Sequence, residues 1–143
     1  MNQIHTSPSQ QKQTQEETSL QDLTRLKARL FKARATLVEE NPFLGSLVLK
    51  LPVIITSDPK VKTACVDARG ICHFGSEFMR RIDLPSLRAV LLHETLHLAL
   101  DAFPRRGTRK ALRWNVSHDF AINLLIDQSA LHDTTLTFPE MFR

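Results

Sequence analysis

The sequence predicts an α+β fold in which helices dominate and about three short strands form a small antiparallel sheet beside them. The chain has 143 residues, 42% hydrophobic and 24% charged, which is typical of one globular domain with its own core. Only four glycines are present, which argues against a barrel or a fold built from loops. Long stretches with helical spacing of apolar residues surround one short β-branched run, Val53–Ile55.

The N-terminal region divides into a polar tail and a helix. Residues 1–17 are rich in Gln, Ser and Thr and almost lack large apolar residues, so we expect a disordered tail. From Thr18 or Ser19, each a suitable N-cap, apolar residues recur with helical spacing as far as Asn41. Pro42 then disfavours continuation. An amphipathic helix over 18–41 therefore opens a single domain that spans 18–143.

The middle of the chain contains the strand signals. Apolar and β-branched runs are separated by segments rich in Asp, Pro and Gly, the usual composition of turns. We expect a short helical segment over 42–51, strands over 53–56, 63–66 and 71–74, a turn over 67–70 and a short helix over 77–82. The edge strand Ile71–Phe74 is a candidate to pair with an extended substrate. Leu131–Arg143 lacks periodicity and is predicted to be an irregular tail packed on the core.

Charge and cysteine content restrict the class of protein only weakly. The formal net charge of +4 is too small to require a nucleic-acid partner. No stretch has the ~18–20 apolar residues of a membrane span, and there is no apolar signal sequence, so a cytoplasmic protein is expected. Cys65 and Cys72 would face each other across two strands, where a bridge is geometrically feasible. We expect both thiols to be reduced in a cytoplasm.

The most informative motif is His93-Glu94-Thr95-Leu96-His97, an HExxH sequence. It lies in a predicted helix that starts near Leu84, with Asp83 or Ser86 as the cap. The helix is apolar nearly all round and is therefore expected at the centre of the fold. Its polar arc holds His93, Glu94, His97 and Asp101, within ~100° of one another at 3.6 residues per turn.

Burying two imidazoles and two carboxylates is costly unless a cation compensates. Zinc accepts imidazole and carboxylate ligands and can keep one position for water. We therefore expect Zn²⁺ on His93 and His97, with Glu94 as general base towards the water. Asp101 is interpreted either as a partner that orients His97 or as a polar helix end.

A second helix, predicted over 113–126, offers the third ligand. His118 and Asp119 are both suitable, but they are adjacent and point about 100° apart, so one of them is expected to reach the metal. Asn123 shares the face of Asp119 and could orient a ligand or bind a neighbouring loop.

Three pieces, TACVDARGICHF, VLLHETLHLAL and RWNVSHDFAIN, resemble in order and spacing the metallopeptidase domain of bacterial and phage proteins that often precedes a von Willebrand factor A-like domain. The resemblance covers the chain from about Pro42 onwards and implies a zincin-like fold with a central HExxH helix. The family's third piece has the form W-N-x-A-x-D-x-x-I-N. It implies Asp119 as third ligand, with His118 at a variable position and Asn123 at the asparagine of the family pattern.

The resulting hypothesis is a zinc metallopeptidase, a hydrolase acting on a peptide or protein substrate. The alternative is a metal-containing module without catalytic activity that binds a partner, such as the AAA+ ATPase or von Willebrand A-like protein that the resemblance suggests. A weaker alternative is a nucleic-acid-associated protein that uses the basic loop Arg105–Lys110.

Overall fold

The computed structural model describes the backbone of residues 8–128 and the side chains of residues 17 and 19–126. In this part of the chain, six helices pack with one three-stranded sheet, which confirms the predicted α+β class. The predicted tail over Leu131–Arg143 lies outside the described residues, as do the first seven residues of the N-terminal one. The elements are α1 Pro8–Glu40, α2 Pro42–Lys50, β1 Val53–Thr56, β2 Ala64–Val66, β3 Cys72–Gly75, α3 Ser76–Arg81, α4 Leu84–Ala99, α5 Ala102–Arg106 and α6 Ala111–Gln128.

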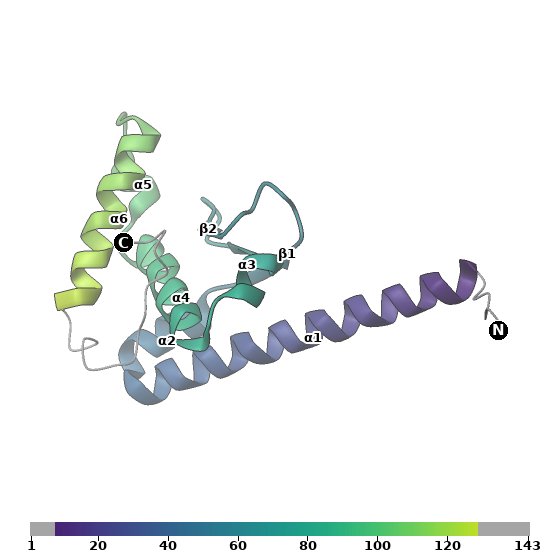
Figure 1. The fold of residues 1–143 in the computed structure, drawn as a ribbon. Helices are drawn as coiled ribbons and strands as arrows, with labels where there is room; N and C mark the ends of the chain where they lie inside the picture. The colour runs from purple at the N-terminus through teal and green to yellow at the C-terminus, as the bar shows by residue number, and fades with distance from the viewer. Residues whose placement is uncertain (1–7, 129–143) are drawn as a thin grey trace, which may run out of the picture.

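Helix α1 is longer than predicted. It begins at Pro8, about ten residues before the expected start, so the expectation of a disordered tail is wrong for residues 8–17. The reason is that Gln, Glu and Lys are good helix formers, and a nucleated helix extends at little further cost. The N-terminal part of α1 extends beyond the other elements (Figure 1). Neither α1 nor any other helix among the described residues is long and apolar enough to cross a membrane.

The corner between α1 and α2 is built for close packing. Asn41 caps α2 by accepting a hydrogen bond from the Leu44 amide at 3.1 Å, and Pro42 occupies the first turn, where no amide hydrogen is needed. A Cβ atom on Gly45 would lie only 2.4 Å from the Val38 Cα, so the absent side chain lets the two helices touch. Pro42 therefore both ends one helix and starts the next.

The sheet is mixed, with strand order β1-β3-β2. Strand β3 pairs in parallel with β1 and antiparallel with β2, so the prediction of an all-antiparallel sheet is wrong. The prediction that Ile71–Phe74 is an edge strand is also wrong, because β3 occupies the centre and β1 and β2 are the edges. The burial of the side chains explains this order: Cys72 and Phe74 are fully buried, as expected for a central strand.

The two cysteines lie on opposite faces of the sheet. Cys65 pairs with His73, whereas Cys72 pairs with Val66, and neighbouring residues of a strand point to opposite faces. The expected facing pair is therefore wrong, and both thiols are free. On the outer face, His73 Nε2 lies 3.0 Å from Asp67 Oδ2 and so joins the strand to the turn before it.

Helix α4 passes through the middle of the fold, between α6 and the strands (Figure 1), as its apolar sequence predicted. The Asp83 carboxylate caps it, accepting a hydrogen bond from the Ser86 amide at 2.8 Å. Its buried side chains pack against those of α1, α2, β2 and α6. A helix held on several sides can carry polar groups in fixed positions, and α4 carries the HExxH motif.

Candidate metal centre

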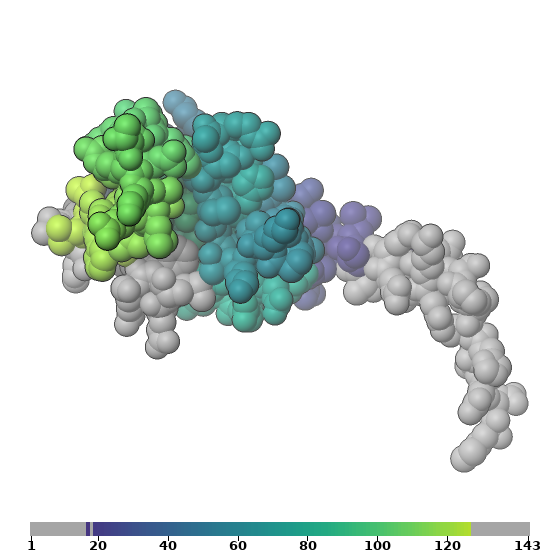
Figure 2. Space-filling view, turned by 90° about the horizontal axis from the view of Figure 1, so that it is seen from above, coloured from purple at the N-terminus to yellow at the C-terminus, as the bar shows by residue number. Residues whose placement is uncertain are grey.

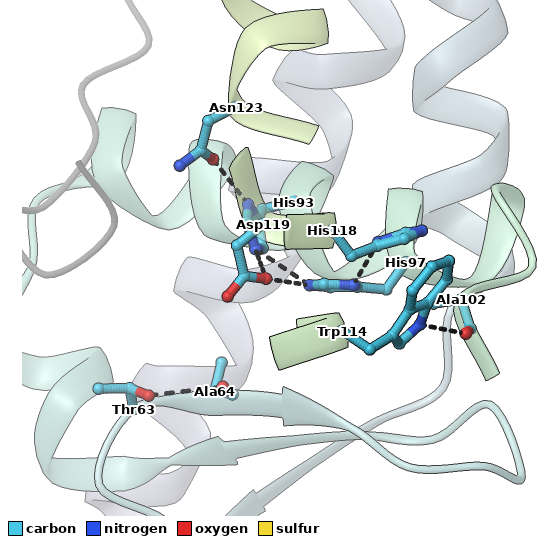
Figure 3. Close-up of polar contacts among 9 residues, drawn as sticks. All are labelled: Thr63, Ala64, His93, His97, Ala102, Trp114, His118, Asp119 and Asn123. Atoms are coloured by element: carbon cyan, nitrogen blue, oxygen red, sulfur yellow. Dashed lines mark hydrogen bonds and ion pairs between the residues drawn. The ribbon is translucent and has the colours of Figure 1, made fainter. Parts of the chain in front are cut away.

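Helices α4 and α6 bring the predicted site residues together. His93 and His97 are one turn apart on α4 and face α6, which contributes His118, Asp119 and Asn123 (Figure 3). The four-residue spacings 93/97 and 119/123 put each pair on one side of its helix. Two short sequence pieces thus form one cluster because their helices pack side by side.

Three ligand atoms form a compact triangle. His93 Nε2 and His97 Nε2 are 3.1 Å apart. Asp119 Oδ1 lies 3.0 Å from His97 Nε2 and 3.3 Å from His93 Nε2. In a tetrahedral zinc site with bonds of about 2.0–2.1 Å, neighbouring ligand atoms are about 3.3–3.4 Å apart. The observed triangle is within a few tenths of an ångström of that size.

The other ring nitrogens of both histidines also have partners. His93 Nδ1 lies 3.0 Å from Asn123 Oδ1, an acceptor, so Nδ1 carries the hydrogen and Nε2 keeps its lone pair. His97 Nδ1 lies 3.1 Å from His118 Nδ1. Burial lowers the pKa of His118, which favours the neutral ring that can accept a hydrogen bond from His97.

With these tautomers, two nitrogen lone pairs and one carboxylate oxygen converge. Three acceptors repel one another unless a cation or protons lie between them. Metal-binding histidines commonly donate their second nitrogen to an acceptor, as His93 does here. The residues present therefore fit a divalent cation such as zinc, by both spacing and hydrogen-bond direction.

Asp119 is held in its charged form. Partial burial raises the pKa of this carboxyl, but the adjacent imidazoles of His93 and His97 outweigh that effect and hold the pKa well below its usual range. The side chain is 47% exposed, so it lies at the open side of the cluster. Of the two candidates on α6, Asp119 is the one whose side chain meets the inner nitrogens, and His118 lies behind His97.

Glu94 lies beside the triangle in a different environment. Its ligand atom is within 4.8 Å of those of His93 and His97, a looser approach than that of Asp119. The residue is 4% exposed, and burial raises the pKa of its carboxyl. The backbone of Val66 on β2 gives it a hydrogen bond. A buried carboxyl with a raised pKa is suited to exchanging protons near neutral pH.

Asp101 is not part of the cluster. Helix α4 ends at Ala99, and Asp101 follows as an exposed residue in the left-handed conformation, with φ 54°, before α5. The sequence analysis extended the helix to Asp101, beyond its end at Ala99, and therefore placed Asp101 on the face of His93 and His97. The segment predicted as the basic loop begins inside α5.

Trp114 is a residue whose role the sequence did not reveal. Its indole N–H donates a 2.7 Å hydrogen bond to the Ala102 carbonyl, which ties α6 to α5. Its ring centroid lies 5.6 Å from that of His118, which in turn stacks on His97 at 5.1 Å. The Arg109 guanidinium lies over the indole ring, 5.0 Å from its centroid. Trp114 and His118 are four residues apart on α6, about one helical turn, and this spacing could have indicated that their rings lie close together.

A cavity of about 500 Å³ opens over the cluster. Strand β2 and the preceding Thr63 form one wall, α6 forms another, and α5 contributes a third. His93, Glu94, His97 and Asp119 all line it, together with Asn123. This volume lies within the range of ~300–1,000 Å³ common for small-ligand sites. The converging ligand atoms therefore border a space large enough for a small ligand.

Comparison with known proteins supports the same assignment. A model of the family described as "putative metallopeptidase domain" matches residues 25–141, which include every residue of the cluster. No curated protein and no solved structure matches the chain. The match confirms the resemblance found in the three sequence pieces and covers most of the chain. The chain belongs to this putative metallopeptidase domain family.

Proposed function

We propose that the protein is a zinc-dependent peptidase, with His93, His97 and Asp119 as ligands and Glu94 as general base. The observation that carries the proposal is the triangle of His93 Nε2, His97 Nε2 and Asp119 Oδ1, with sides of 3.0–3.3 Å. The family description supports hydrolysis of peptide bonds as the reaction class.

The number of ligands favours a catalytic over a structural metal. Structural zinc sites usually have four protein ligands, often cysteines, and are closed to solvent. Here three side chains converge, and a cavity opens beside them. Among the described residues, the close group of potential ligands contains no cysteine: Cys72 is buried in the core, and Cys65 lies on the opposite face of the sheet from Cys72.

Bound zinc would lower the pKa of a coordinated water towards about 7 and polarise the carbonyl of the substrate. The protein's own side chains account for the proton transfers. Glu94 accepts a proton from the attacking water and delivers it to the leaving amine, which needs a carboxyl whose pKa burial has raised. Its hydrogen bond with Val66 keeps it oriented towards the cavity.

The remaining residues hold the ligands in place. Asn123 fixes the ring of His93, and His118 fixes that of His97, so both Nε2 atoms point inwards. The hydrogen bond from Trp114 to Ala102 ties α6 to α5, next to the ring of His118. Such support keeps the ligand atoms at metal-binding distance without reorganisation.

Glu94→Gln tests the proposal, because it keeps the size of the side chain and removes its basicity. We expect wild type and variant to bind one zinc each, by elemental analysis, and only the wild type to cleave a broad peptide library. Equal cleavage by both would exclude Glu94 as the base. Full zinc occupancy without any cleavage by the wild type would favour a metal-containing interaction module.

Elemental analysis also identifies the metal. Two histidines and one carboxylate also hold iron in some oxygenases. The buried Glu94 beside the site favours hydrolysis, because it supplies a base next to the water position. Iron instead of zinc in protein purified from a host grown with both metals would contradict the zinc assignment.

A further inference from the structure

Helix α6 presents two neighbouring rows of side chains to the cavity and its rim. One row is polar and consists of Asn115, Asp119 and Asn123, all of which line the cavity. The second row follows one position later, and its members are large, apolar and exposed: Leu112, Val116, Phe120 and Leu124. Residues four apart stay on one side of a helix, so the second row is a continuous apolar stripe beside the metal ligand.

Two members of the stripe belong to the cavity itself. Val116 and Phe120 line it, although they are 47% and 69% exposed. An exposed phenylalanine costs free energy unless something covers it, and large apolar surfaces next to a cavity commonly mark ligand contacts. Phe103 of α5, also on the cavity wall and 38% exposed, extends the apolar surface.

The opposite wall offers main-chain groups. The Gly75 amide donates to the Thr63 carbonyl at 2.7 Å, so these residues form a hydrogen-bonded pair of the antiparallel ladder. Such pairs alternate along a strand, which means that the backbone groups of Ala64 and Val66 point away from β3. They point to the edge of β2 that no other strand of the sheet covers, where the cavity lies and where the Val66 backbone hydrogen-bonds Glu94. An extended peptide can hydrogen-bond there as an added strand.

Both walls line the same cavity, and the buried Glu94 lines it as well. In Figure 2 the green surface of α5 and α6 lies beside the blue-green surface of the middle of the chain. A peptide that passes between these walls presents alternate side chains to either side. One of them meets α6 at Val116 and Phe120, next to the ligand Asp119.

We infer that the site selects extended polypeptides with a large apolar side chain next to the bond that is attacked, and that Val116 and Phe120 determine this preference. The inference rests on the proposed peptidase function and names its substrate class. The charged side chains that line the cavity do not define a different preference. They are Arg106, which is basic, and Glu94 and Asp119, which are acidic. Both acidic groups belong to the catalytic centre, so the apolar wall remains to distinguish side chains.

Binding without turnover gives the first test. The probe is a pair of fluorescein-labelled, Ser- and Thr-rich decapeptides with Phe or Asp at the centre, bound to the zinc-loaded chain carrying Glu94→Gln. Anisotropy should give a Kd at least about tenfold lower for the Phe peptide, since the covered ring leaves water. Adding Phe120→Ser should reduce the ratio to about twofold or less, and Phe120→Leu should preserve most of it.

The matched control is Phe31→Ser on α1, a phenylalanine that is 75% exposed and does not line the cavity. It should leave the ratio unchanged. Equal affinity for both peptides, or a ratio that survives combined Val116→Ser and Phe120→Ser, would overturn the inference. Circular dichroism of each variant verifies the fold, which substitutions at these exposed positions should preserve.

Cleavage of the same peptides by the wild type separates the two proposals. Cleavage with kcat/KM at least about tenfold higher for the Phe peptide supports both. Selective binding without cleavage would refute the peptidase function and support the apolar docking site. Cleavage at equal rates would support the peptidase function and refute the role of Val116 and Phe120.

Discussion

Removing the Asn123 amide should weaken zinc binding although Asn123 touches no metal in the proposed site. Its Oδ1 lies 3.0 Å from His93 Nδ1, which fixes the tautomer and the ring orientation of that ligand. Loss of such a partner typically costs 10–100-fold in metal affinity, or about 1.4–2.7 kcal/mol. We therefore expect Asn123→Ala to raise the zinc Kd by about that factor. Asn123→Asp, which keeps an acceptor, should stay near wild type.

The assay is competition for zinc with a chromophoric chelator at fixed pH, with the fold verified by circular dichroism. Asn115→Ala is the matched control, because Asn115 lies in the same polar row of α6 and lines the same cavity but is exposed. It should leave the Kd unchanged. Wild-type affinity in Asn123→Ala, or equal losses in Asn123→Ala and Asn115→Ala, would refute the view that Asn123 orients His93.

Three further predictions address the fold and the site. Gly45→Ala should lower the free energy of unfolding by roughly 1–3 kcal/mol in urea titrations, since the new Cβ would meet the Val38 backbone at 2.4 Å. The hydrogen bond with His73, followed by that with the Ile71 amide, holds the pKa of Asp67 below its usual range. The charged Asp67 carboxylate therefore contributes its full share to the stability of the fold above about pH 4, and this share is lost as the pH falls through the lowered pKa. The wild-type Tm should consequently fall more steeply below about pH 4 than the Tm of Asp67→Asn. Trp114 is the chain's one tryptophan, so its emission should change when zinc binds and return when a chelator is added.

The HExxH helix was predictable from local sequence. The apolar residues around His93 to His97 require burial, and the four-residue spacing places both imidazoles on one side. The cap at Asp83 follows from the same local rules. The predicted polar arc was wrong only for Asp101. Helix α4 ends two residues before it, and no local feature of the sequence marks that end.

The choice between His118 and Asp119 could not be made from spacing alone. Their 100° separation on α6 shows that they point differently, but the rotation of α6 against α4 decides which one faces the inner nitrogens. The resemblance favoured Asp119, and the distances to His93 and His97 now support that choice. His118 is buried and contacts the outer nitrogen of His97 instead, with 3.1 Å between the two Nδ1 atoms.

The sheet shows where local patterns reach their limit. The turn over 67–70 correctly joined two antiparallel strands, because a short connection permits no other arrangement. The position of β1 depends on contacts between residues distant in sequence. Its own residues do not indicate whether it pairs with β3 in parallel or antiparallel. As a result, the strand edge that borders the cavity belongs to β2 and not to β3. The start of α1 was missed for a related reason, since polar residues can extend a helix without an apolar face.

The most direct test of the metal centre is X-ray absorption at the zinc edge on the zinc-loaded protein. The proposed site predicts four nitrogen or oxygen neighbours at about 2.0–2.1 Å, two of them imidazoles, and no sulfur. The imidazole signal should halve in His97→Ala and stay unchanged in His118→Ala. A zinc–sulfur distance of about 2.3 Å, or a third imidazole that disappears in His118→Ala, would contradict the assignment of His93, His97 and Asp119.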